Sequence, residues 1–163
     1  MYNPKSKKTH IFCGTLCLLS VVLDQASKLF AINHLTLHVP YPILPFVNFT
    51  LTFNKGISFS MLNSYDSSLL IILAFICIFL LLWAYKRFNS DIERILLSLV
   101  IGGAIGNLID RFVHGMVVDF IDVYLPSKIW FGNAEIHFPA FNMADSFITL
   151  GVSGLILHNL FKK

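Results

Sequence analysis

Apolar residues gather in four long runs along the chain, separated by stretches in which polar residues recur. The runs cover residues 11–32, 68–85, 95–111 and 143–160. Each is close to the length of about 20 residues that an α-helix needs to cross the apolar core of a bilayer. The pattern predicts a membrane protein of mainly α class, with four transmembrane helices in a single domain over residues 1–163.

Two shorter stretches have the alternating period of a β-strand. In residues 47–54, apolar side chains alternate with Asn48, Thr50, Thr52 and Asn54, and residues 116–121 alternate in the same way after Gly115. We expect these stretches to pair in a small sheet outside the bilayer, resting on lipid or on a lipid-bearing substrate. An ordinary hairpin in solvent is the alternative, although it would leave many large apolar groups in water.

The segments beside these strands give weaker signals. Prolines at positions 40, 42 and 45 allow only an edge strand or an extended lead-in there. Residues 57–61 could form another strand after a turn at Lys55 and Gly56. Residues 124–138 predict no regular element, except that 129–131 has the composition of an interfacial anchor. Asp91, Glu93 and Arg94 are expected to form a solvated turn.

Composition supports the membrane assignment. The chain is 56% hydrophobic and 13% charged, with a mean hydropathy of +0.73, which is far too apolar for a soluble domain of 163 residues. Its net charge of +3 reflects basic residues near span ends and gives no reason to expect a nucleic-acid partner. The three cysteines all lie in predicted spans, so we expect no disulfide framework.

Basic residues predict how the spans are oriented, because lysine and arginine in short loops remain on the cytoplasmic side. They lie before the first run, between the second and third, and at the end of the chain: Lys5, Lys7, Lys8, Lys86, Arg87, Arg94, Lys162 and Lys163. Both termini should therefore be cytoplasmic. The start of the chain resembles a secretory signal, but it has no convincing cleavage site, and we interpret it as a retained anchor.

Ionisable residues within the predicted spans lie almost entirely near the outer surface. Asp24 and Lys28 are four residues apart on one helix face, and Asp24 lies about 21 Å above His10 at a helical rise of about 1.5 Å per residue. Charges inside a membrane are costly and normally face a protein interior or water. This pair could simply lock helix packing, or it could line a site, and the two roles are compatible.

The third and fourth runs bring further polar groups to the same depth. They are Asn107, Asp110 and Arg111 at the end of a glycine-rich run, and Asn142 and Asp145 at the start of the last run. Arg111 alone could be explained as an arginine that reaches the interface. A transporter or channel needs polar groups along its whole path, so a cluster on one side favours an enzyme that meets its substrate at the outer leaflet.

Paired carboxylates suggest the chemistry. Two acids held close together cannot both ionise easily, so one keeps a proton while the other activates water, and hydrolysis then needs no metal or cofactor. Asp119 and Asp145 are our candidates, but the residues alone leave Asp110 and Asp122 open as well. Other constellations are weaker. The outer histidines lack metal-site spacing, and residues 151–154, which are similar to a rhomboid serine motif, lack a histidine at matching depth.

Five motifs in order give the chain a specific resemblance. They are Asp24 with Lys28; Asn54-Lys55-Gly56 with Phe59; Gly102-Gly103-Ala104 through Asn107 to Asp110-Arg111; Gly115 through Val118 to Asp119-Phe120; and Phe141-Asn142 with Ala144-Asp145. Each motif is weak by itself. Together they cover nearly the whole chain, which resembles the bacterial lipoprotein signal peptidases, also called the signal peptidase II family.

The resemblance implies four transmembrane helices with a small extracytoplasmic β-cradle, in the bacterial plasma (inner) membrane. It also implies an aspartic endopeptidase that cuts prolipoproteins before a diacylglyceryl-modified cysteine, acts as a monomer in contact with membrane lipid, and is the target of globomycin. Asp119 and Asp145 would be catalytic, and the residues that shape the site would be Asp24, Lys28, Asn54, Gly56, Asn107, Asp110, Arg111 and Asn142. A small transporter or assembly protein without enzymatic activity is the alternative.

Overall fold

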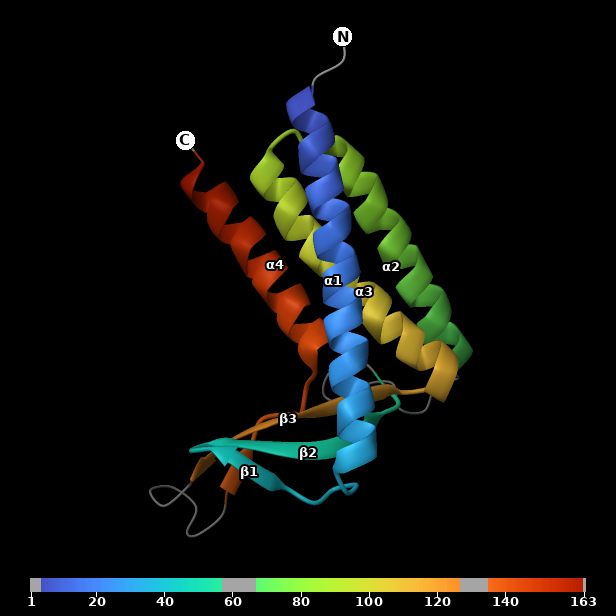
Figure 1. The fold of residues 1–163 in the computed structure, drawn as a ribbon, viewed down its shortest axis with the longest axis vertical. Helices are drawn as coiled ribbons and strands as arrows, with labels where there is room; N and C mark the ends of the chain where they lie inside the picture. Colours follow the sequence, from blue (N-terminus) through green and yellow to red (C-terminus); the bar gives the residue numbers. More distant parts are fainter. Residues whose placement is uncertain (1–3, 57–66, 127–134, 163) are drawn as a thin grey trace.

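Four long helices form the body of the molecule (Figure 1). The computed structural model describes residues 4–56, 67–126 and 135–162. The helices are α1 (Pro4–His34), α2 (Ser67–Arg87), α3 (Asp91–His114) and α4 (Met143–Phe161). Each contains one of the predicted apolar runs, and each is long and apolar enough to cross a membrane. The predicted mainly α membrane fold is confirmed, with helices that extend a few residues beyond most of the expected boundaries.

A four-stranded antiparallel sheet lies at one end of the helices. Its strands are β1 (Tyr41–Leu44), β2 (Val47–Asn54), β3 (Val117–Pro126) and β4 (Glu135–His137), in that spatial order. The predicted pairing of the two alternating stretches is confirmed by β2 and β3. The proline-containing β1 is an edge strand, as expected. The expected strand in 57–61 and the expected anchor at 129–131 lie outside the described residues.

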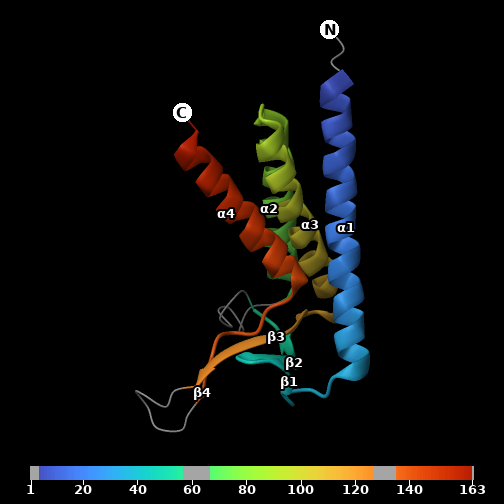
Figure 2. The ribbon, with the colours of Figure 1, turned by 60° about the vertical axis from the view of Figure 1, so that its left-hand side comes forward.

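The sheet extends across the ends of the helices, and both chain termini lie at the opposite end (Figures 1 and 2). One face of the sheet packs against the end of α1. Ala31 of α1 forms a buried cluster there with Leu51 of β2 and with Val118 and Phe120 of β3. This apolar contact fixes the sheet at the depth of Asp24 and Lys28, which lie one to two turns earlier on the same helix.

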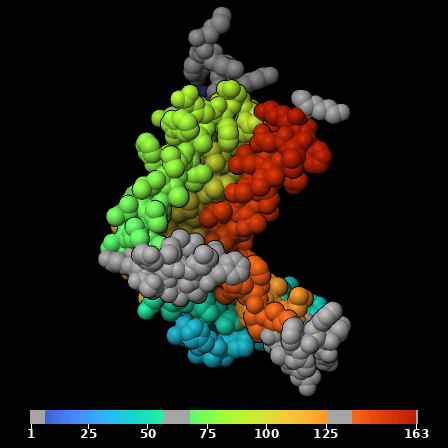
Figure 3. Space-filling model, turned by 180° about the vertical axis from the view of Figure 1, so that it is seen from behind, coloured from blue at the N-terminus to red at the C-terminus, as the bar shows by residue number. Residues whose placement is uncertain are grey.

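Helix α3 lies at the centre of the bundle, where it packs against α1, α2 and α4. Seen from behind, its surface is visible between α2 and α4 (Figure 3). Small residues make the close contacts possible. A Cβ atom on Gly103 would collide with the carbonyl oxygen of Ala144 in α4, and one on Gly102 would lie 2.9 Å from the carbonyl oxygen of Cys17 in α1.

We expect Gly103→Ala to lower the thermal stability of the detergent-solubilised protein, because the added methyl group meets backbone atoms that cannot move independently. Overpacking of this kind costs about 1–3 kcal/mol. Gly14→Ala is the matched control, since a Cβ atom there has nothing within 4 Å, and alanine is the better helix former. Equal melting temperatures for the two variants would contradict the close packing of α3 on α4.

One expectation about the other end of the bundle is wrong. Residues 91–94 are not a solvated turn but the first turn of α3. Glu93 is only 5% exposed, and its carboxylate accepts hydrogen bonds from Lys162 Nζ at 2.7 Å and from the backbone N–H of Ser90 at 3.4 Å. The sequence pattern could not show this, because Lys162 follows Glu93 by 69 residues.

Candidate active site

Asp119 is a buried acid with a strongly raised pKa, and it lies where the sheet meets the helices. It lies on β3, and it is only 2% exposed. Asn54 of β2 donates to its Oδ2 atom at 3.2 Å, and Asn142 donates to its Oδ1 atom at 2.7 Å. Burial, followed by the negative charge of Asp145, raises the pKa of Asp119 to about 7. A carboxyl with this pKa can keep its proton near neutral pH.

Asp145 is held by the start of α4. Asn142 is the N-cap residue, with extended backbone, and its side-chain oxygen accepts a hydrogen bond from the backbone N–H of Asp145 at 3.0 Å. In return, Asp145 Oδ2 accepts from the backbone N–H of Asn142 at 3.3 Å. This reciprocal pair is a capping box. Asn107 of α3 donates to the other carboxylate oxygen at 2.8 Å.

Asn142 therefore connects the two acids. Its side-chain nitrogen donates to Asp119, while its backbone nitrogen donates to Asp145. The same residue is fully buried and also lies within hydrogen-bond distance of the carbonyl oxygen of Val118. The loop before α4 is thus held against β3, so that a carboxylate from the sheet and one from the helix flank a single asparagine. The structure therefore places Asp119 and Asp145, the pair that the family resemblance implies, on either side of Asn142.

A buried ion cluster is bonded to the residues that precede these two acids in the chain. Lys28 Nζ is 2.8 Å from Asp24 and 2.9 Å from Asp110, and all three side chains are at most 2% exposed. Each acid also accepts a backbone hydrogen bond, Asp24 from Ala144 at 2.8 Å and Asp110 from Val118 at 3.0 Å. The cluster therefore joins α1, α3, α4 and β3. The first role left open for Asp24 and Lys28, locking the packing of the elements, is therefore seen, and the second, lining a site, stays a prediction.

A chain of hydrogen bonds leads from this cluster to Asp145. Lys28 donates to the side-chain oxygen of Asn107 at 2.9 Å, and Asn142 donates to the same oxygen at 3.1 Å. Because that oxygen is occupied by two donors, the amide nitrogen of Asn107 must face Asp145. Lys28 thus fixes the orientation of a side chain that contacts one of the two acids.

Arg111 and Gly56 lie on the other side of the pair. The guanidinium of Arg111 donates to the carbonyl oxygen of Asn107 at 3.1 Å and to that of Gly56 at 3.3 Å. Gly56 in turn donates its backbone N–H to the side-chain oxygen of Asn54 at 3.0 Å. Arg111 is therefore bound to protein groups beside the acids, which an arginine that merely reaches the interface would not require.

One polar group in this region, Gln25, was not singled out from the sequence. Gln25 donates to Asp110 at 2.9 Å and to the carbonyl oxygen of Gly106 at 3.1 Å. Its only sequence signal is its place beside Asp24. Asp122, left open as a rival to the candidate pair, lies further along β3 and accepts a hydrogen bond from His137 of β4. Among the residues that the structure describes, no group of three or more His, Cys, Asp or Glu side chains could hold a metal ion.

Comparison with known proteins agrees with this geometry. The family model described as signal peptidase (SPase) II matches residues 16–161. The chain is 44% identical to a lipoprotein signal peptidase of Coxiella burnetii over 98% of this chain and 96% of that protein. It is 39% identical to one of Bartonella henselae, over 88% and 85% of the two chains.

A solved structure shows the same architecture. It is described as a bacterial membrane enzyme, it is 29% identical, and it superposes with a TM-score of 0.78 over 91% of this chain and 87% of that chain. Membership of a peptidase family does not favour a transporter or an assembly protein. The match over most of the chain, the relatives at 44% and 39% identity, and the shared fold establish that this chain belongs to the signal peptidase II family of membrane peptidases.

Proposed function

We propose that this protein is an aspartic endopeptidase in which Asp119 and Asp145 together hydrolyse the signal-peptide bond of lipoprotein precursors. Cleavage would occur before a cysteine that carries diacylglycerol. The observation that carries the proposal is the asparagine shared by the two acids: Asn142 donates to Asp119 from its side chain at 2.7 Å and to Asp145 from its backbone at 3.3 Å. The arrangement supplies two carboxyls of unlike environment, which acid–base hydrolysis of a peptide requires.

The two environments suggest separate roles. Asp119 is the acid that keeps a proton, because it is buried and close to the charge of Asp145. Asp145 accepts hydrogen bonds from the side chain of Asn107 and from the backbone N–H of Asn142, and it lies in the first turn of α4; we assign it the role of the base. In the proposed reaction Asp145 takes a proton from water as the water oxygen attacks the peptide carbonyl, while Asp119 gives its proton to the carbonyl oxygen.

Breakdown of the resulting tetrahedral intermediate completes the cycle. The carbonyl oxygen returns its proton to Asp119 as the C–N bond breaks, and the leaving nitrogen takes the proton held by Asp145. The products are a carboxyl at the end of the signal peptide and a free amine on the lipid-modified cysteine. Both carboxyls regain their starting protonation states, so no covalent enzyme intermediate is required.

Cleavage should depend on pH in a defined direction. Since the pKa of Asp119 is raised to about 7, the protonated form is lost as pH rises through that value. We expect kcat/KM to fall about tenfold per pH unit above this point, because the profile of kcat/KM follows the free enzyme. Stability should be measured in parallel, since the raised pKa of Asp119 makes the folded state less stable as pH rises from about 3.8 to about 7, so that this loss is nearly complete where the fall in kcat/KM begins. A kcat/KM that stays constant up to pH 9 in folded protein would contradict the assignment.

The placement of the pair fits a substrate held in the outer leaflet. Asp119 lies on β3 and Asp145 lies in the first turn of α4, and Figure 1 shows the sheet and the start of α4 at the end of the bundle opposite the two termini. With basic residues near those termini, the positive-inside rule supports cytoplasmic termini and an active site near the extracytoplasmic surface of the plasma membrane. The uncovered side of α3 between α2 and α4 (Figure 3) offers the acyl chains an apolar approach. We also propose that the protein acts as a monomer and that it is a target of globomycin.

The test of this function compares two precursors that differ only in lipid. Purified protein is incubated with a precursor that carries diacylglyceryl on its cysteine and with the unmodified form, and the products are measured by mass spectrometry. We expect cleavage of the modified precursor alone, with a new N-terminus at the cysteine. Cleavage of the unmodified form alone would show a peptidase with another substrate.

A further inference from the structure

Asp122 is a buried carboxylate that the proposed reaction does not use. It lies on β3 and is only 6% exposed. Three side chains from neighbouring strands approach it: His137 Nδ1 at 2.8 Å, Thr50 Oγ1 at 3.0 Å and Asn48 Nδ2 at 3.5 Å. A buried charge is costly unless hydrogen bonds satisfy it. Asp122 and these three partners therefore form a second polar cluster on the sheet.

Asp122 faces the same side of the sheet as Asp119. The alternating polar residues of β2 contact both acids: Asn54 donates to Asp119, and Thr50 donates to Asp122. The two acids are three positions apart in the chain, a spacing that would place them on opposite faces of a regular strand. The alternation is not regular here, because the pairing of β2 with β3 shifts register between Phe49 and Thr52, opposite Ile121 and Asp119. At the same point the backbone N–H groups of both Phe120 and Ile121 donate to the carbonyl oxygen of Phe141, at 3.1 and 2.8 Å.

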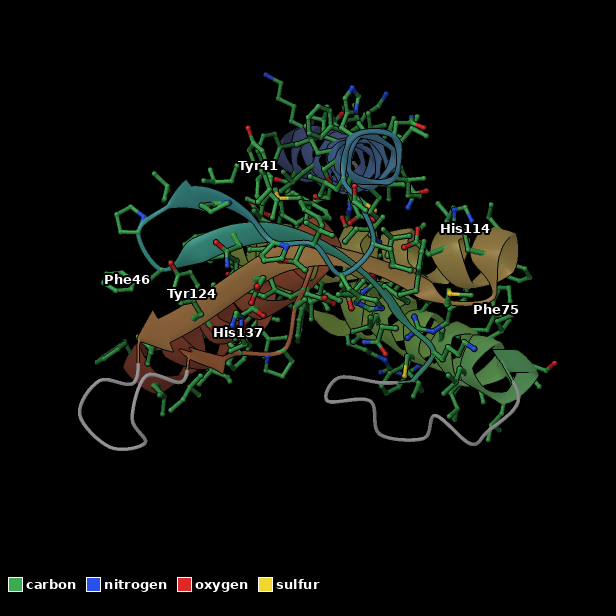
Figure 4. The ribbon with its side chains drawn as sticks, turned by 90° about the horizontal axis from the view of Figure 1, so that it is seen from below. Tyr41, Phe46, Phe75, His114, Tyr124 and His137 are labelled. Atoms are coloured by element: carbon green, nitrogen blue, oxygen red, sulfur yellow. The ribbon has the colours of Figure 1, made fainter. Side chains whose placement is uncertain are left out.

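Within this polar cluster around Asp122, His137 is the residue exposed to solvent, with a side chain that is 42% exposed. Its ring is fixed in two ways, by the hydrogen bond to Asp122 and by stacking on Tyr124, with ring centroids 5.5 Å apart and an interplanar angle of 27°. In Figure 4, His137 and Tyr124 lie at the opposite end of β3 from His114 and Phe75. An oriented imidazole thus stands on the polar face of the sheet, beyond the catalytic pair.

We propose that His137 and Thr50, positioned by Asp122, bind the polypeptide segment that follows the cleavage point of the precursor. This inference rests on the proposed function. Polar side chains form a continuous row along β2, from Asn54 beside Asp119 to Thr50 beside Asp122. An extended chain advances about 3.3 Å per residue, so a substrate lying along this row would reach His137 about three residues beyond the scissile bond.

The direction of the bound chain follows from polarity. The apolar signal segment must remain in the bilayer with the helices, whereas the segment after the cysteine is polar and leaves the membrane. Strands β2 and β3 pair from Asn54 and Val117 to Val47 and Val123, and in Figure 1 these strands extend beyond the ends of the helices toward β4. The ligand is therefore an extended backbone with hydrogen-bonding groups, which His137 and Thr50 can meet through an imidazole N–H and a hydroxyl.

The test uses two lipid-modified precursors, one that ends with an amide one residue after the cysteine and one that continues for at least six residues. Wild type should bind the long precursor better, with a KM about threefold to tenfold lower, the range expected for one or two hydrogen bonds. His137→Ala and Thr50→Val should raise the KM of the long precursor toward that of the short one. Neither should change kcat on the short precursor by more than about twofold.

His34→Ala is the matched control, since His34 is an exposed histidine at the end of α1 that contacts only its own helix turn among the contacts described for it. It should leave both KM values unchanged. If His137→Ala and Thr50→Val lower cleavage of both precursors equally, the polar cluster around Asp122 only stabilises the sheet, and the proposal fails. It also fails if wild type does not distinguish the two lengths, a result that leaves the proposed function intact. Cleavage of neither precursor by wild type would overturn both.

Discussion

Asp119→Asn and Asp145→Asn should each reduce cleavage of a lipid-modified precursor by about a thousandfold, since a single acid–base group typically contributes about 10²–10⁴ to the rate. Asparagine keeps the shape and most hydrogen-bonding capacity of aspartate, but it can neither hold nor accept the transferred proton. Asn142 can still donate to residue 119, so its link to the α4 loop should persist. The loss should therefore appear in kcat in folded protein.

The two substitutions should not be additive. If Asp119 and Asp145 share one reaction, the double variant should be about as inactive as either single variant, because residues that act as a unit lose their function together. Multiplied losses would indicate independent roles. Each variant should be compared with wild type by thermal unfolding, since Asp119 is buried and a change at that position could also alter folding.

Lys28→Met should have the largest effect on stability. It would leave Asp24 and Asp110 buried without their shared cation, which lies 2.8 and 2.9 Å from them. Removing one partner of a buried ion pair costs about 3–5 kcal/mol in typical proteins. We therefore expect a large drop in the melting temperature of the solubilised protein. Activity should fall as well in whatever fraction folds, because Asn107 loses the donor that fixes its amide.

Lys86→Met is the matched control, since Lys86 lies in the last turn of α2, far from this cluster. Adding Asp110→Asn to Lys28→Met should recover part of the stability, because it removes one of the two unpaired charges while an amide oxygen can still accept from Val118. A Lys28→Met protein that melts at the wild-type temperature would show that the cluster contributes little to the fold.

The helices could be predicted because spanning a bilayer imposes a long apolar run that is visible in one sequence. Strand β2 was visible for a related reason: one face packs against α1 while the other carries Asn54 and Thr50, so its residues alternate. The depth of Asp24 and Lys28 followed from helical rise alone. These are local rules, in which each residue depends on its neighbours in the chain.

Features that depend on distant contacts could not be predicted. Strand β4 has only three residues and exists because it pairs with the end of β3. The register of β2 against β3 shifts where the backbone N–H groups of Phe120 and Ile121 both donate to Phe141, so Asp119 and Asp122 depart from the simple alternation. The burial of Glu93 similarly depends on Lys162. Even the pairing of Asp119 with Asp145 was favoured mainly by family resemblance, since several acids share that depth.

The most direct test of the central claim is single-turnover cleavage of the lipid-modified precursor by wild type, Asp119→Asn, Asp145→Asn and Asp91→Asn. Asp91 is the control acid, with a 58% exposed side chain at the start of α3, at the opposite end of the bundle from the sheet (Figure 1). The account predicts cleavage at the cysteine by wild type and Asp91→Asn, and none by the other two variants in folded form. Normal turnover by either Asp119→Asn or Asp145→Asn would contradict it.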